Sequence, residues 1–136
     1  MNLTIATISK QINATFEGDD SLPIDAISID SRSLQNGPHT LFFALIGPNN
    51  DAHLYINDLI QQGVTHFVVQ YIPEHCEGKA QFLVVQNTLA ALQDLASYHR
   101  SLFHFPVIGV TGSNGKTIVK EWLNFLLSPD YSIIRS

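Results

Sequence analysis

A glycine-rich turn close to the end of the sequence constrains this chain more than any other stretch. The turn reads TGSNGKT over residues 111–117, follows the apolar residues 107–110 and opens a helical pattern over residues 116–127. Because glycine lacks a Cβ, backbone N–H groups in such a turn can converge on phosphate oxygens, and the helix adds free N–H groups and the positive end of its dipole. A strand, a glycine-rich turn and a helix in this order predict a phosphate-binding loop.

The loop departs from the general pattern G-x-x-x-x-G-K-[ST] at one position, where Val110 stands in place of a glycine. We expect Lys116 to reach the β- and γ-phosphates of ATP and the Thr117 hydroxyl to bind Mg²⁺, so these two are the candidate catalytic residues. The alternative is a strand–helix turn that binds nothing. The candidate ATP-binding residues are Thr111, Gly112, Ser113, Asn114, Gly115, Lys116 and Thr117.

Upstream of the loop, short apolar runs alternate with helical patterns, which predicts an α/β fold with a largely parallel sheet. Thr4 is the expected N-cap of the first helix, and Asn87 or Thr88 that of the third. The third helix is expected to bury a stripe of Leu89, Leu92, Leu95, Ala96 and Tyr98 or His99. Strands are expected at residues 24–30, 41–46, 65–70 and 81–86, and helices at residues 3–16, 54–62 and 87–103.

The position of the loop predicts two domains. Residues 1–105 are enough for a small complete domain, and Pro106 with the strand after it marks the boundary. Residues 106–136 supply only a strand, the loop, a helix and the start of another strand, and this unit cannot bury both faces of a sheet. We therefore expect a complete domain followed by the first part of a second, in a piece of a longer protein.

The composition excludes several classes of protein. The 136 residues are 45% hydrophobic and carry a net charge of −5 with only seven Lys and Arg, which argues against disorder and against nucleic-acid binding. No apolar run is long enough for a membrane span, and the N-terminus lacks the features of a signal peptide. A cytoplasmic location is therefore expected, with the single Cys76 an inert thiol.

Two motifs together resemble one known family. TGSNGKT is similar to the ATP loop of the Mur ligases, the cytoplasmic synthetases of peptidoglycan precursors, and the VKEW that follows is most similar to the branch that adds D-alanyl-D-alanine. Residues 29–53 resemble the N-terminal signature of the family, although NGPHT replaces its usual P-G-D turn and Ile118 replaces a Thr or Ser after the loop. The matching residues are Asp30, Ser31, Arg32, Leu41, Phe42, Ala44, Leu45, Gly47, Asp51 and His53.

The resemblance implies the fold and activity of the parent protein. It implies a small substrate-binding α/β domain followed by the first strand–P-loop–helix unit of a truncated ATPase domain. The parent would use ATP and Mg²⁺ to join UDP-N-acetylmuramoyl-tripeptide and D-alanyl-D-alanine through an acyl phosphate, while this chain alone would be inactive. By the same resemblance, the UDP moiety would contact Ser31, Arg32, Ala44, Gly47, Asn50, Asp51 and His53.

Each of these assignments has an alternative. Asp30 and Arg32 can form a surface ion pair of small energetic value. Asn50 or Asp51 can cap the next helix, and His53 can be a first-turn residue with a backbone partner. The alternative functions are an amino-acid-adding ligase of the same family, another ATP-loop protein such as a small nucleotide kinase, and a non-catalytic module that binds a nucleotide sugar.

Overall fold

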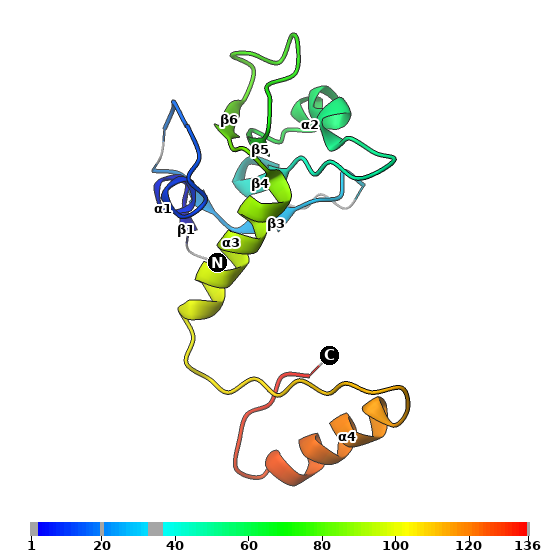
Figure 1. Cartoon of the computed structure of the whole chain (residues 1–136). Coiled ribbons are helices and arrows are strands. Elements are labelled where there is room, and N and C mark those ends of the chain that lie inside the picture. Colours follow the sequence, from blue (N-terminus) through cyan, green and yellow to red (C-terminus); the bar gives the residue numbers. More distant parts are fainter. Residues whose placement is uncertain (1–2, 20, 33–36, 136) are drawn as a thin grey trace. The chain divides into compact units, whose positions relative to one another are not determined.

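A four-stranded parallel sheet organises the first of two units in this computed structural model (Figure 1). The structure describes residues 3–19, 21–32 and 37–135, and its first unit ends at Phe103 while the second begins at His104. The strands are paired in chain order, so each new strand adds to the same edge of the sheet. They are β3 (Ala26–Ser28), β4 (Thr40–Phe43), β5 (His66–Val69) and β6 (Gln81–Val84).

The short elements before the sheet begin with a capped helix. Helix α1 (Ile5–Gln11) starts after Thr4, whose side chain accepts a hydrogen bond from the Thr7 N–H, so the expected N-cap is confirmed. Strands β1 (Leu3–Thr4) and β2 (Pro23–Ile24) pair antiparallel beside it. The strand expected at residues 24–30 is therefore divided between β2 and β3.

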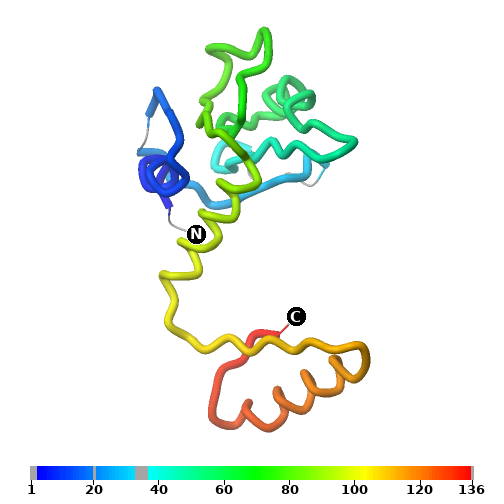
Figure 2. The backbone as a smooth tube through the Cα atoms, viewed as in Figure 1, coloured from blue at the N-terminus to red at the C-terminus, as the bar shows by residue number. Residues whose placement is uncertain are grey.

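The connections between the parallel strands differ in length and content. Between β3 and β4, the 3₁₀ turn η1 (Gly37–His39) lies next to residues 33–36, which are outside the described part of the chain. Between β4 and β5 lie η2 (Ala52–Tyr55) and α2 (Ile56–Gln61). Figure 2 traces the connection from β5 to β6, in green, as a long loop without a helix.

Both faces of the sheet are covered by other parts of the chain. Successive residues of a strand point to opposite faces, so neighbouring residues pack in different clusters. On one face, Leu41 and Phe43 pack with residues of α1 and of α3 (Thr88–Ser101). On the other face, Phe42 packs with α2 and with Cys76 of the long loop, and the Cys76 side chain is almost fully buried. Burial on both sides explains why β4 reads as an unbroken apolar run in the sequence.

The third predicted helix is present as α3, with Asn87 as its N-cap, and its buried face matches the expected stripe in part. Leu95 is buried, and Leu92 and Tyr98 pack against the core as expected. The fully buried residues are Thr88, Ala91 and Leu95. Leu89 is 51% exposed and Ala96 is exposed as well, so both were wrongly placed in the apolar stripe.

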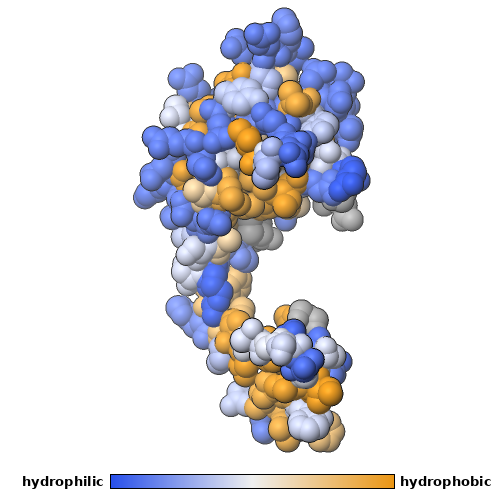
Figure 3. Space-filling model, turned by 45° about the vertical axis from the view of Figure 1, so that its right-hand side comes forward, coloured by the Kyte–Doolittle hydropathy of each residue, from blue (hydrophilic) through white to orange (hydrophobic). Residues whose placement is uncertain are grey.

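The second unit contains helix α4 (Lys116–Leu127), as predicted, but neither of the expected strands. Residues 107–110 and 131–135 are not strands, because a strand requires hydrogen bonds to a neighbouring strand and neither segment has such a partner among the described residues. No residue of α4 is buried, and Trp122 is 68% exposed. Figure 3 shows apolar side chains gathered on the surface of this unit. None of the helices in the described part of the chain is long and apolar enough to cross a membrane.

The core of the first unit gives a prediction about stability. Leu83 lies on β6 and is completely buried between the sheet and the helices of its face. We expect Leu83→Ala to lower the free energy of unfolding by about 2–5 kcal/mol, because it removes apolar contacts and leaves a cavity. Leu54→Ala is the matched control, since Leu54 is 74% exposed and its loss should cost less than about 0.5 kcal/mol. Urea unfolding followed by circular dichroism measures both, and equal losses would contradict the assignment of the core.

Candidate functional site

The predicted UDP-site residues gather at one edge of the sheet. In a parallel sheet the carboxyl ends of all strands lie at the same edge, and α/β proteins bind ligands in the crevice outside it. Ser31 and Arg32 follow β3, and the predicted residues from Ala44 to His53 follow β4, which pairs directly with β3. The topology therefore brings the two halves of the sequence signature to adjacent positions.

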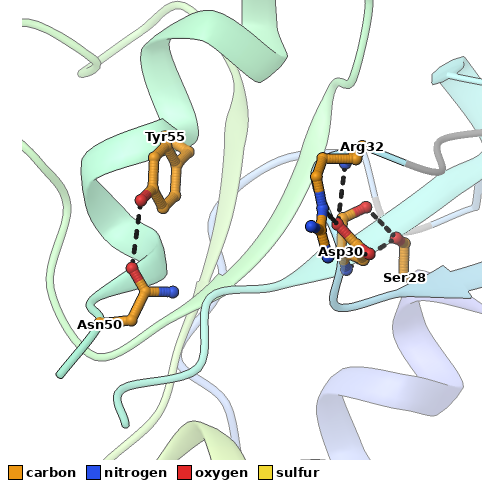
Figure 4. A network of polar contacts seen from close by, with 5 residues as sticks. All are labelled: Ser28, Asp30, Arg32, Asn50 and Tyr55. Atoms are coloured by element: carbon orange, nitrogen blue, oxygen red, sulfur yellow. Dashed lines mark hydrogen bonds and ion pairs between the residues drawn. The ribbon is translucent and has the colours of Figure 1, made fainter. Parts of the chain in front are cut away.

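After β3, the polar side chains bond to one another. The Arg32 Nε and Nη2 atoms donate to the two carboxylate oxygens of Asp30, each at 3.0 Å, and the Ser28 hydroxyl bonds to the Asp30 carbonyl (Figure 4). The hydrogen bonds from the Arg32 side chain and backbone N–H lower the pKa of Asp30, and the side-chain contact raises the pKa of Arg32. Arg32 and Asp30 form the surface ion pair that was the alternative assignment. The Arg32 side chain is 88% exposed, so this ion pair contributes little to stability. Ser31 is half-buried in the turn between them.

After β4, the chain extends the sheet and then turns. Ala44 is fully buried, and its N–H donates to the Val68 carbonyl at 2.9 Å, so its side chain belongs to the core. Gly47 is exposed, and its N–H donates to the carbonyl of Asn50 at 2.7 Å, which closes a turn over residues 47–50. The exposed Asn50 side chain accepts a hydrogen bond from the Tyr55 hydroxyl at 3.1 Å (Figure 4).

Asp51 and His53 form a connected pair in the first turn of η2. Asp51 is the N-cap of η2 and accepts from the His53 N–H at 2.9 Å, as the capping alternative anticipated. His53 is buried, and its Nε2 accepts from the Gln70 N–H at 3.0 Å, which is the expected backbone partner. An accepting Nε2 leaves the ring proton on Nδ1, which donates to Asp51 at 2.6 Å. Both ring nitrogens of His53 therefore have protein partners.

Sequence reasoning missed one member of this group, Tyr71. Its hydroxyl donates to Asp51 Oδ2 at 2.6 Å, and its ring stacks on the His53 ring with centroids 4.2 Å apart. Burial acts to raise the pKa of Asp51, but the hydrogen bonds from Tyr71 and His53 outweigh it and the pKa lies below its usual value. The same hydrogen bond raises the pKa of Tyr71. The only signal in the sequence was a polar aromatic residue directly after a predicted strand.

The predicted ATP loop has the backbone geometry of a turn that opens a helix. Gly115 is the N-cap of α4 with a φ of 78°, a conformation that residues with a Cβ rarely adopt, and Gly112 has a φ of 146°. No side chain caps the start of α4, so its first N–H groups face outward. The Lys116 ammonium donates to the Gly112 carbonyl across the loop. Residues 111–117 are all exposed.

The Thr117 hydroxyl, expected to bind Mg²⁺, lies exposed in the first turn of α4. Among the described residues, no three His, Cys, Asp or Glu side chains form a cluster that could hold a metal ion. The exposed N–H groups and Lys116 of the loop suit phosphate oxygens, and the Thr117 hydroxyl suits a metal ion.

Comparisons with known proteins agree with this geometry. No family model matches the chain. A UDP-N-acetylmuramoyl-tripeptide–D-alanyl-D-alanine ligase of Buchnera aphidicola is 38% identical over 109 residues, which are 79% of this chain and 23% of the relative. A UDP-N-acetylmuramoyl-L-alanyl-D-glutamate–2,6-diaminopimelate ligase of Bacteroides thetaiotaomicron is 35% identical over 108 residues, 78% of this chain and 22% of the relative.

Solved structures show the same likeness. A crystal structure of MurF from Acinetobacter baumannii superposes with a TM-score of 0.81 and 29% identity, covering 97% of this chain and 28% of that protein. MurF from Thermotoga maritima in complex with ADP gives a TM-score of 0.64 and 27% identity over 80% of this chain and 24% of that protein. The chain thus spans about a quarter of the length of its relatives.

Named Mur ligases match most of this chain both in sequence and in fold. The chain belongs to the Mur ligase family. Within that family, MurF proteins, the ligases named for D-alanyl-D-alanine, are among the relatives in both the sequence and the structure comparisons.

Asp51 gives a prediction about pH. Because its pKa is lower in the folded than in the unfolded chain, the carboxylate stabilises the fold above the unfolded value of about 3.9 and loses this contribution as the pH falls through the folded value. We expect Asp51→Asn to lower the free energy of unfolding by about 1–3 kcal/mol at pH 7, and the difference from the unaltered chain to shrink below pH 4.

The control is Asp94→Asn on the exposed side of α3, which should change stability little at either pH. Urea unfolding at pH 7 and at a series of pH values below 4 measures both variants. A difference between Asp51→Asn and the unaltered chain that stays constant with pH would show that the carboxylate charge is unimportant.

Proposed function

We propose that this chain is the part of a D-alanyl-D-alanine-adding Mur ligase that binds the UDP end of the precursor and begins the ATP site. The observation that carries the proposal is the uncapped start of α4, opened by Gly115 and carrying Lys116, in a chain whose relatives include named D-alanyl-D-alanine ligases. A solved relative in complex with ADP supports the use of ATP. In this proposal, residues 1–105 form the domain that binds the UDP-precursor, and residues 106–136 form the start of the ATP-binding domain.

The reaction of the whole protein is an amide synthesis driven by ATP. The tripeptide carboxylate attacks the γ-phosphorus of ATP, which releases ADP and forms an acyl phosphate. The amine of D-alanyl-D-alanine then attacks the acyl carbon, phosphate leaves, and the amine loses a proton. Protein groups contribute to such a phosphoryl transfer mainly by holding the reactants in line and by neutralising charge.

In this proposal the loop residues bind and orient the nucleotide. The N–H groups of residues 111–117 and the start of α4 donate to phosphate oxygens, and the helix dipole favours their negative charge. The Lys116 ammonium already lies over the loop at Gly112, within reach of phosphates held there. Mg²⁺ would neutralise phosphate charge, with the Thr117 hydroxyl as one of its ligands.

At the carboxyl edge of the sheet, the proposed UDP contacts fall into two groups. Ser31 and Asn50 offer neutral donors and acceptors, and the exposed Gly47 lets a ligand approach the backbone. Arg32 offers an exposed cation whose fork fits a diphosphate, at the cost of its contact with Asp30. Ala44, Asp51 and His53 would shape the edge without direct side-chain contact, because their side chains are buried or bonded to protein partners. We place the activity in the cytoplasm.

A second candidate is an amino-acid-adding ligase of the same family. The diaminopimelate ligase relative supports it, because its identity of 35% is close to that of the D-alanyl-D-alanine ligases. The two candidates share the UDP end and the ATP loop, and they differ in the second substrate. Testing the whole protein with D-alanyl-D-alanine and with single amino acids separates them.

Ligand titration tests the two sites of this chain separately. We expect UDP to shift the amide resonances of residues 28–53 and ATP with Mg²⁺ to shift those of residues 109–117, because each ligand meets its own set of donors. Lys116→Ala should weaken ATP binding at least about tenfold, since it removes the loop cation. Lys79→Ala is the control, as an exposed lysine of the first unit.

A response to ATP alone would favour a general nucleotide-loop protein, and a response to UDP alone would favour a non-catalytic binding module. Unchanged ATP affinity in Lys116→Ala would contradict the assignment of the loop.

A separate prediction concerns turnover. We expect this chain alone to release no phosphate when supplied with ATP, Mg²⁺, UDP-N-acetylmuramoyl-tripeptide and D-alanyl-D-alanine, because it spans only about a quarter of the ligases to which it is related. A phosphate-release assay with a full-length relative as positive control makes the measurement. Turnover dependent on both acceptor and donor would show that the chain is catalytically complete.

A further inference from the structure

Tyr71 connects the end of one strand to the turn that follows its neighbour, and the proposed ligand contacts do not include it. Its hydroxyl donates to Asp51 Oδ2 across 20 positions of sequence, and its ring lies almost parallel to that of His53, at an angle of 11°. Tyr71 follows β5 and Asp51 follows β4, and these two strands are paired. The contact therefore bridges neighbouring strands at the carboxyl edge.

The donors around Asp51 indicate what its carboxylate does. Oδ1 accepts from the N–H and from the Nδ1–H of His53, and Oδ2 accepts from Tyr71. A carboxylate engaged in this way is a poor partner for a diphosphate, because it is anionic and its oxygens already have donors from the protein. Its charge acts on the protein itself, by holding the start of η2 against the end of β5.

The turn that directly precedes Asp51 is closed by backbone hydrogen bonds. The Gly47 N–H donates to the Asn50 carbonyl at 2.7 Å, and the Ala52 N–H donates to the Leu45 carbonyl at 3.0 Å. These two hydrogen bonds enclose residues 47–50 immediately before the anchored carboxylate. The Asp51 side chain is thus joined directly to a backbone turn that presents Asn50 at the edge.

We propose that Tyr71 is a positioning residue for ligand binding at the carboxyl edge: its hydroxyl fixes Asp51, and Asp51 fixes the turn over residues 47–50. This inference rests on the proposed function, in which a uridine diphosphate group binds at that edge. The Tyr71 side chain is 45% exposed, so the fold does not depend on it as on a core residue. Phenylalanine at this position keeps a ring to stack on His53 and removes only the hydroxyl.

Amide hydrogen exchange tests the positioning step without any ligand. In Tyr71→Phe, the Gly47 and Ala52 amides should exchange about tenfold faster than in the unaltered chain, because local opening of the turn becomes easier. The Ala44 amide, which donates to Val68 inside the sheet, should keep its rate. Tyr98→Phe on α3 is the matched control and should leave all three rates unchanged. Equal rates for Gly47 and Ala52 in Tyr71→Phe overturn the inference.

Binding of UDP tests the consequence for the ligand. Titration of the chain with UDP should give a dissociation constant about five- to tenfold higher for Tyr71→Phe and an unchanged one for Tyr98→Phe. The same UDP affinity in Tyr71→Phe and the unaltered chain overturns the inference while leaving the proposed function intact. If the unaltered chain does not respond to UDP, the proposed function fails, and the exchange rates of Gly47 and Ala52 alone decide whether Tyr71 positions the turn.

Discussion

The parallel pairing of four short strands is the constraint on which the arrangement of the first unit depends. Parallel strands must all end at the same edge, so residues that follow β3, β4 and β5 meet there although they are separated by long stretches of sequence. Helices and the loop between β5 and β6 cover both faces of the sheet, which leaves the carboxyl edge as the place where polar side chains can gather. The polar side chains of this unit are thus concentrated in the turns after the strands, while its helices pack on the faces of the sheet.

At the carboxyl edge of the sheet, polar side chains form hydrogen bonds with one another. Asp30 holds Arg32, Asp51 holds His53 and Tyr71, and Tyr55 holds Asn50. The contacts differ in kind. The Arg32 pair is exposed and can be exchanged for a ligand at small cost, whereas the His53 contacts are buried and fix the backbone. Two neighbouring parts of one sequence signature therefore differ physically: one forms an exposed ion pair, and the other forms buried contacts that hold a turn.

The sequence predicted what depends on local pattern. The apolar runs of β4 and β5, the caps Thr4 and Asn87, and the extent of α4 all follow from neighbours within a few residues. It did not predict what depends on distant partners. Tyr71 meets Asp51 only because β4 and β5 pair, and residues 107–110 are not a strand because strand structure requires a second chain segment. Leu89 fits the helical period, but the buried face of α3 is the one that carries Ala91.

The division of the chain into two units coincides with a useful distribution of its rarest residues. The single cysteine, Cys76, is enclosed in the core of the first unit, and the single tryptophan, Trp122, lies on α4 in the second. Thiol labelling therefore reports the opening of one unit, and indole fluorescence reports the surroundings of the other. The unaltered chain therefore carries an independent probe in each unit, and conditions that loosen one unit can be recognised without any mutation.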